Sequence, residues 1–116
     1  MLKTAADLIA IAQTKIKCVD VNEANKIFKQ SDDVVIIDVR ETESANKSKL
    51  SDSVNISRGL IEMKVPGLAP DTETVILTHC GGGGRASMAA ATLKEMGYKN
   101  VYAITAKYED IKKVFG

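Results

Sequence analysis

The sequence predicts an α/β fold with a central, mostly parallel five-stranded sheet and helices on both faces. Two observations support this prediction. Short runs of β-branched residues alternate along the chain with helix-like segments, as they do where a helix connects each pair of parallel strands. The run at 34–37 (VVII) is apolar at every position, which is typical of a strand buried on both faces of its sheet.

Two helices and one short strand are expected in the first thirty residues. Residues from about 4 to 14 are apolar at helical spacing, which predicts an amphipathic helix with one apolar face made by Leu8, Ile11 and Ala12. A short strand fits residues from about 16 to 19. A helix over about 23–30 follows, and its N-cap is either Asp20 or Asn22.

The remaining elements follow the same alternation. Four further strands are expected at about 34–37, 54–56, 75–77 and 101–104, and three helices at about 58–64, 85–96 and 107–115. Gly97 directly follows one of these helices, where glycine is the usual terminating residue. The most polar stretch, 41–53, is either a surface loop or a short solvated helix.

Length and composition exclude several classes of protein. The chain has the length of a single domain, 1–116, with residues 1–15 as a helix packed on it. A net charge of +1 gives no sign of nucleic acid or an anionic membrane as partner. Asp7 interrupts the only apolar run near the N-terminus, and no segment approaches the roughly 20 apolar residues of a membrane span. One histidine and two distant cysteines make no zinc site, and no nucleotide or flavin motif occurs, so neither metal nor cofactor is expected.

Cys80 is the strongest candidate for a functional residue. It follows the strand-like run at 75–79 and precedes four glycines and a cation, in the order Gly81, Gly82, Gly83, Gly84 and Arg85. Glycines leave backbone N–H groups free to converge on one point, and the N-terminus of the following helix favours an anion. Both effects favour the thiolate, which is the reactive form of cysteine. The pattern predicts a nucleophile in an anion-binding cradle. Because such a thiol must stay free, it also indicates a reducing compartment, the cytoplasm.

A second polar segment is expected at the same edge of the sheet. Ligands of parallel sheets bind beyond the carboxyl ends of the strands. Asp38 and Arg40 follow one buried strand as Cys80 follows another. We expect Asp38 and Arg40 to form an ion pair that supports the site without taking part in the chemistry.

The chain resembles a single-domain rhodanese, a member of the sulfurtransferase fold family. Residues 37–41 (IDVRE) match a signature of that family, and residues 80–87 (CGGGGRAS) resemble its active-site loop, CxxGxR[AS]. Residues 96–102 (MGYKNVY) resemble its closing helix-to-strand segment. The three matches occur in the family's order and span nearly the whole chain from Ile16 onward.

The resemblance implies a sulfurtransferase that acts in two steps. Cys80 attacks the outer sulfur of a donor such as thiosulfate and becomes a persulfide, and a thiol, or cyanide in vitro, then accepts that sulfur. The loop amides stabilise the persulfide anion, and Arg85 holds the anionic part of the donor. Arg58 lies near the pocket in related sequences and is expected to help bind an anionic donor. The loop lacks the extra basic residue common in thiosulfate-preferring members, so a protein persulfide is an alternative donor.

Two other functions stay open at this stage. One is a relay or binding module without turnover, which accepts sulfur from one protein and passes it to another; the uncharged glycine loop suits this role. The other is a phosphatase or arsenate reductase of the Cdc25-like class, which also uses a cysteine, an anion cradle and an arginine. Members of that class often have histidine before the cysteine, as His79 stands here. Their loop is one residue longer than Gly81–Gly84, which makes this function the less favoured.

Two side chains have uncertain roles. Adjacent strand residues point to opposite faces, so we expect His79 to be a packed or hydrogen-bonded histidine and not a base for Cys80. Cys18 is either a core thiol, which we favour, or a resolving cysteine.

Overall fold

The computed structural model describes residues 1–116 and confirms the α/β architecture. Five strands form one sheet in the spatial order β1-β5-β4-β2-β3, and every neighbouring pair is parallel. The strands are β1 (Lys17–Val19), β2 (Val34–Asp38), β3 (Ser53–Asn55), β4 (Val75–His79) and β5 (Asn100–Ile104). The carboxyl ends of β2 and β4 are therefore neighbours, which brings the segments after Asp38 and His79 to one edge.

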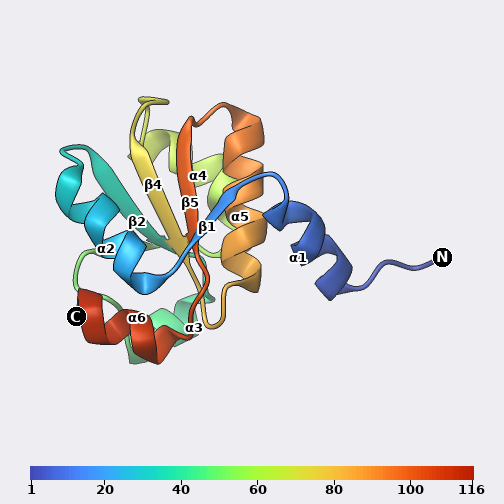
Figure 1. Ribbon diagram of the computed structural model, residues 1–116, viewed down its shortest axis with the longest axis horizontal. Helices are drawn as coiled ribbons and strands as arrows, with labels where there is room; N and C mark the ends of the chain where they lie inside the picture. Colours follow the sequence, from blue (N-terminus) through green and yellow to red (C-terminus); the bar gives the residue numbers. More distant parts are fainter.

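Helices cover both faces of the sheet, as Figure 1 shows. On one face lie α2 (Val21–Gln30) and α6 (Tyr108–Phe115), and on the other lie α4 (Ile61–Leu68) and α5 (Gly84–Met96). The helix α1 (Ala5–Gln13) packs on α5, at the outside of the molecule. Two short elements, α3 (Thr42–Lys47) and the 3-10 helix η1 (Arg58–Leu60), lie in the crossovers around β3.

Two apolar layers stabilise this arrangement. Alternation along the strands sends Ile36 and Leu77 toward α2 and α6, while Ile37 and Ile76 pack against α4 and α5. Each of these four side chains is at least 99% buried, and burial of one such side chain contributes about 1.5–3 kcal/mol. The sheet-facing side of α5 is rich in alanine, which lets this helix approach the sheet closely; its buried apolar residues are Ala86, Ala89, Ala90 and Leu93.

Local signals explain where the helices begin and end. The Asp20 carboxylate accepts a hydrogen bond from the Glu23 amide at 2.8 Å, so Asp20 is the N-cap of α2 and Asn22 lies inside the helix. Gly97 ends α5 with φ +120°, a conformation that favours glycine. Of the two alternatives for 41–53, a short helix is present as α3, and a turn follows it.

The expectation that Cys18 is a core thiol is wrong. Cys18 is exposed, because β1 is an edge strand and only its last residue, Val19, is buried. The apolar face of α1 is also only partly covered, since Leu8 and Ile11 are 44% and 38% exposed. None of the helices is long and apolar enough to span a membrane.

Candidate active site around Cys80

The Cys80 sulfur lies in a cradle of backbone amides at the carboxyl edge of the sheet. Cys80 follows β4 directly and is only 2% exposed. Its Sγ atom accepts hydrogen bonds from the amides of Gly83, at 3.1 Å, and Ala86, at 3.4 Å. Ala86 belongs to the first turn of α5, a helix of 13 residues whose N-terminus favours negative charge near the sulfur. This environment is suited to a thiolate or a persulfide anion.

The position of Gly83 requires glycine for two reasons. Its φ angle is +105°, and a Cβ atom there would lie 3.0 Å from the Cα of Thr105. The Gly83 carbonyl accepts hydrogen bonds from the hydroxyl of Ser87, at 2.7 Å, and from its amide, at 2.9 Å. The fixed carbonyl and the positive φ angle together set the direction of the Gly83 amide, which donates to the sulfur.

Arg85 supplies a positive charge at the mouth of the cradle. It is exposed and forms no ion pair within the chain. Its Nη2 atom lies over the loop, 3.8 Å from the place that a Cβ of Gly81 would occupy. The guanidinium is thus near the loop and free to pair with an anion from solution.

Asp38 and Arg40 form the expected ion pair beneath the loop. Arg40 Nη2 lies 2.8 Å from Asp38 Oδ2, and Nε lies 3.0 Å from Oδ1; the Arg40 amide also donates to Oδ1 at 3.0 Å. Burial disfavours the carboxylate, but the hydrogen bonds from Arg40 outweigh it and lower the pKa of Asp38. Hydrogen bonding to Asp38, partly opposed by burial, raises the pKa of Arg40. Both groups therefore remain charged at neutral pH.

Tyr108 connects this ion pair to the loop, and the sequence analysis missed it. The Cζ atom of Arg40 lies 4.0 Å from the centroid of the Tyr108 ring, in a cation–π arrangement. The Tyr108 hydroxyl is 2.7 Å from the hydroxyl of Ser48, and its amide donates to the Gly81 carbonyl at 3.1 Å. The only signal in the sequence was an aromatic residue at the start of the last predicted helix.

His79 faces away from the nucleophile, as strand alternation predicts. Cys80 packs in the layer of α4 and α5, whereas the His79 ring lies beside the Tyr108 ring of α6, with centroids 6.1 Å apart. His79 is fully buried, and neither ring nitrogen has a hydrogen-bond partner. Burial lowers the pKa of His79, and the nearby Asp38 carboxylate offsets this only in part. His79 is therefore a neutral packing residue.

Arg58 lies along α5 and makes no hydrogen bond with the loop. Its Nη2 atom donates to the Thr92 hydroxyl at 3.2 Å, and Nη1 lies 3.6 Å from the Glu62 carboxylate. Thr92 comes about 9 Å of helix axis after Ala86, the residue whose amide contacts the sulfur. The structure thus gathers Cys80, Arg85 and the glycine loop at one edge, and the polar contacts of Arg58 are with Thr92 and Glu62. No group of three or more His, Cys, Asp or Glu side chains is arranged to hold a metal ion.

The chain belongs to the Rhodanese-like domain family, whose model matches residues 20–113. It is also 35% identical over 75 residues to the "Putative sulfur carrier protein YrkF" of Bacillus subtilis. These residues make up 65% of this chain and 40% of that relative, so the similarity spans less than half of the relative's length.

Solved structures share the fold. A Rhodopseudomonas palustris protein of unknown function, described as "Possible Tyrosine Phosphatase", superposes with a TM-score of 0.85 at 24% identity, covering 100% of this chain and 94% of that chain. The polysulfide-sulfur transferase homodimer of Wolinella succinogenes has a TM-score of 0.72 at 24% identity, covering 87% of this chain and 76% of that chain. At these identities the likeness shows a common fold alone.

Proposed function

We propose that the protein is a sulfurtransferase that carries sulfane sulfur as a persulfide on Cys80. The observation that carries this proposal is the pair of amides, from Gly83 and Ala86, directed at a single sulfur atom. Fixed N–H donors stabilise negative charge at the place where it develops during the reaction. A thiolate before the transfer and a persulfide anion after it both need such stabilisation.

The transfer comprises two displacements at sulfur. The Cys80 thiolate attacks the outer sulfur of the donor, and the bond from that sulfur to the rest of the donor breaks. From thiosulfate, sulfite leaves with the electron pair of that bond. An acceptor thiolate then attacks the outer sulfur of the Cys80 persulfide, and Sγ leaves as the thiolate again. Arg85 would pair with an anionic donor at the mouth, while Asp38, Arg40 and Tyr108 hold the loop from below.

The donor in this proposal is thiosulfate or a protein persulfide, and the acceptor is a thiol, with cyanide as its substitute in vitro. The four glycines carry no charge, so Arg85 is the only cation that the loop segment offers to a small anion. This favours a relay role, in which a protein donor presents its own persulfide to Cys80. Fast loading from a protein persulfide together with slow loading from thiosulfate would identify the relay, and the reverse would identify a thiosulfate sulfurtransferase. Either role needs a free thiol, which suits a reducing compartment such as the cytoplasm.

The test is the mass of the intact protein after incubation with thiosulfate, compared between wild type and Cys80→Ser. We expect a gain of about 32 Da in the wild type alone, reversed by cyanide or dithiothreitol. Arg85→Gln serves as a matched variant and should slow loading by thiosulfate without preventing it. If thiosulfate and a persulfidated protein both leave the wild-type mass unchanged, sulfur transfer through Cys80 is wrong. Release of phosphate from p-nitrophenyl phosphate would then favour the phosphatase class.

A further inference from the structure

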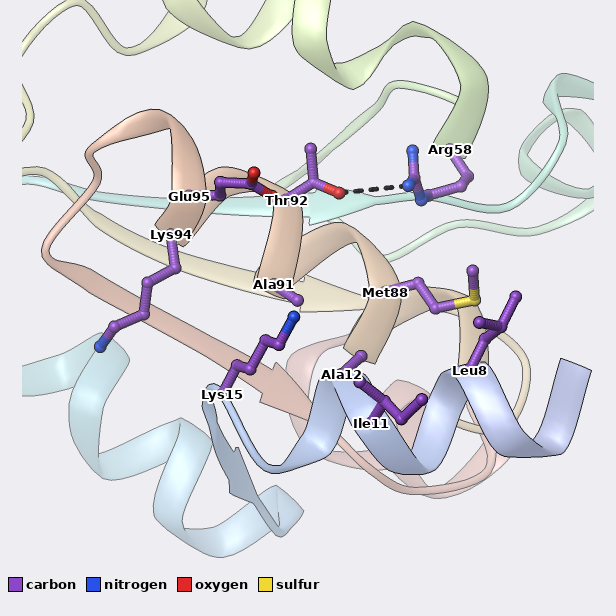
Figure 2. Close-up of a pocket in the computed structure, with 10 residues that line it drawn as sticks. All are labelled: Leu8, Ile11, Ala12, Lys15, Arg58, Met88, Ala91, Thr92, Lys94 and Glu95. Atoms are coloured by element: carbon purple, nitrogen blue, oxygen red, sulfur yellow. Dashed lines mark hydrogen bonds between the residues drawn. The ribbon is translucent and has the colours of Figure 1, made fainter. Parts of the chain in front are cut away.

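A half-open groove with a volume of about 430 Å³ lies between α1 and α5, apart from the Cys80 cradle. Figure 2 shows α1 as one wall and α5 as the floor, with Arg58 of η1 on the opposite side. The volume falls within the range of small-molecule sites, which is roughly 300–1,000 Å³. None of the residues whose amides contact the Cys80 sulfur lines this groove.

The groove exposes apolar surface that nothing in the chain covers. Leu8 and Ile11 of α1 line it and are 44% and 38% exposed, although both are large aliphatic side chains. Met88 of α5 lies opposite them and is half-buried. Leu8, Ile11 and Met88 together form an apolar surface of flexible or branched side chains, whose chemistry matches that of an aliphatic chain.

The charges around this apolar surface are predominantly positive. Lys15, Arg58 and Lys94 line the groove together with a single acid, Glu95. In Figure 2 the Lys15 ammonium is directed toward the floor at Ala91. Neither lysine forms an ion pair, and the only acidic partner of Arg58 is a carboxylate at 3.6 Å.

Arg58 gives a second, independent indication of a ligand. Its Nε atom is buried and has no hydrogen-bond partner, and the 3.6 Å contact with Glu62 is long for an ion pair. The side chain is 27% exposed, so part of the guanidinium can be reached from the groove. Arg58 therefore adds positive charge to the groove, which the long contact with Glu62 offsets only in part.

We propose that the groove binds an amphipathic monocarboxylate, with an unbranched aliphatic chain of about eight to ten carbons. The chain lies against Leu8, Ile11 and Met88, and the carboxylate pairs with the Lys15 ammonium, which is directed toward the floor of the groove. Apolar burial provides the affinity, and the positive charges select a negative head group. The proposal is independent of sulfur transfer, since it concerns binding at residues that do not contact the Cys80 sulfur.

The test is an NMR titration of the ¹⁵N-labelled protein with sodium decanoate below its micelle concentration. We expect saturable shifts of amides in residues 8–15 and 88–95, and hexanoate should bind at least about tenfold more weakly because four methylenes are lost. Decyltrimethylammonium has the same apolar chain with a positive head, and it should not bind there. Equal binding of the cation, or no saturable shift with decanoate, would overturn the proposal.

Variants locate the site. Ile11→Asp places a negative charge on the apolar wall at an exposed position and should weaken decanoate binding at least about tenfold. Lys15→Gln should weaken it roughly twofold to fivefold, as expected for an exposed ion pair. Lys113→Gln, at an exposed lysine of α6, is the matched control and should leave binding unchanged. Wild-type affinity in Ile11→Asp would show that decanoate binds elsewhere and would refute the assignment. Circular dichroism verifies that each variant is folded.

Discussion

His79 should make the stability of the fold depend on pH. The ring is fully buried among Asp38, Arg40 and Tyr108, and neither nitrogen has a hydrogen-bond partner. Burial lowers the pKa of His79 in the folded protein, whereas in the unfolded chain the pKa is about 6.5. Between these two values the unfolded chain binds one proton more than the native protein does. The free energy of unfolding therefore falls as the pH decreases through about 6.5.

The size of this change in unfolding free energy is limited by the one proton that His79 binds in the unfolded chain. In the window below the unfolded pKa, a difference of one proton changes the free energy of unfolding by about 1.4 kcal/mol per pH unit. Lowering the pH from 7.5 to 5.5 crosses about one unit below the unfolded pKa, so His79 should account for a loss of at most about 1.4 kcal/mol. Typical domains have a stability of about 5–15 kcal/mol, so the loss is easily measured.

The assay is urea unfolding at pH 7.5 and 5.5 for wild type and His79→Phe, which keeps an aromatic ring beside Tyr108 but cannot bind a proton. The chain has no other histidine. Subtracting the change in unfolding free energy of the variant from that of the wild type removes the contribution of the carboxylates, which both proteins share. We expect the wild type to lose more than the variant does, by at most about 1.4 kcal/mol. Equal pH dependence in both proteins would refute the reasoning, as would a wild type that gains stability at pH 5.5.

Three other substitutions test the loop and its support. Gly83→Ala introduces a Cβ at φ +105° against Thr105, so we expect a loss of at least about 1–2 kcal/mol in urea unfolding and slower persulfide loading by mass spectrometry. Asp38→Asn leaves the Arg40 guanidinium buried without its counter-charge and should cost about 3 kcal/mol. In the wild type the contribution of the Asp38–Arg40 pair to the free energy of unfolding is present above about pH 4, and it is lost as the pH falls below the lowered pKa of Asp38. Unchanged stability of Asp38→Asn would contradict a stabilising role of the pair. Cys18→Ser should leave persulfide loading unchanged, because Cys18 is an exposed thiol on an edge strand, and a marked loss would instead identify a resolving cysteine.

Features encoded by neighbouring residues were predictable from the sequence. Apolar runs such as 34–37 located the strands, and the glycines after Cys80 predicted a loop whose amides reach the sulfur. Features that depend on distant contacts were not. Tyr108 contacts Ser48, which lies sixty positions earlier in the chain, and no local pattern marks such a pair. The exposure of Cys18 follows from the place of β1 at the sheet edge, which the spatial order of the strands decides.

Both ends of the chain contact the loop that holds Cys80. The Tyr108 amide of α6 donates to the Gly81 carbonyl, and Ile9 of α1 packs so closely on Gly84 that a Cβ there would lie 2.7 Å from it. The loop is therefore complete only when α1, which precedes it in the sequence, and α6, which follows it, have both docked on the rest of the fold. Loosening of either helix would remove a contact from the loop without altering any residue next to Cys80.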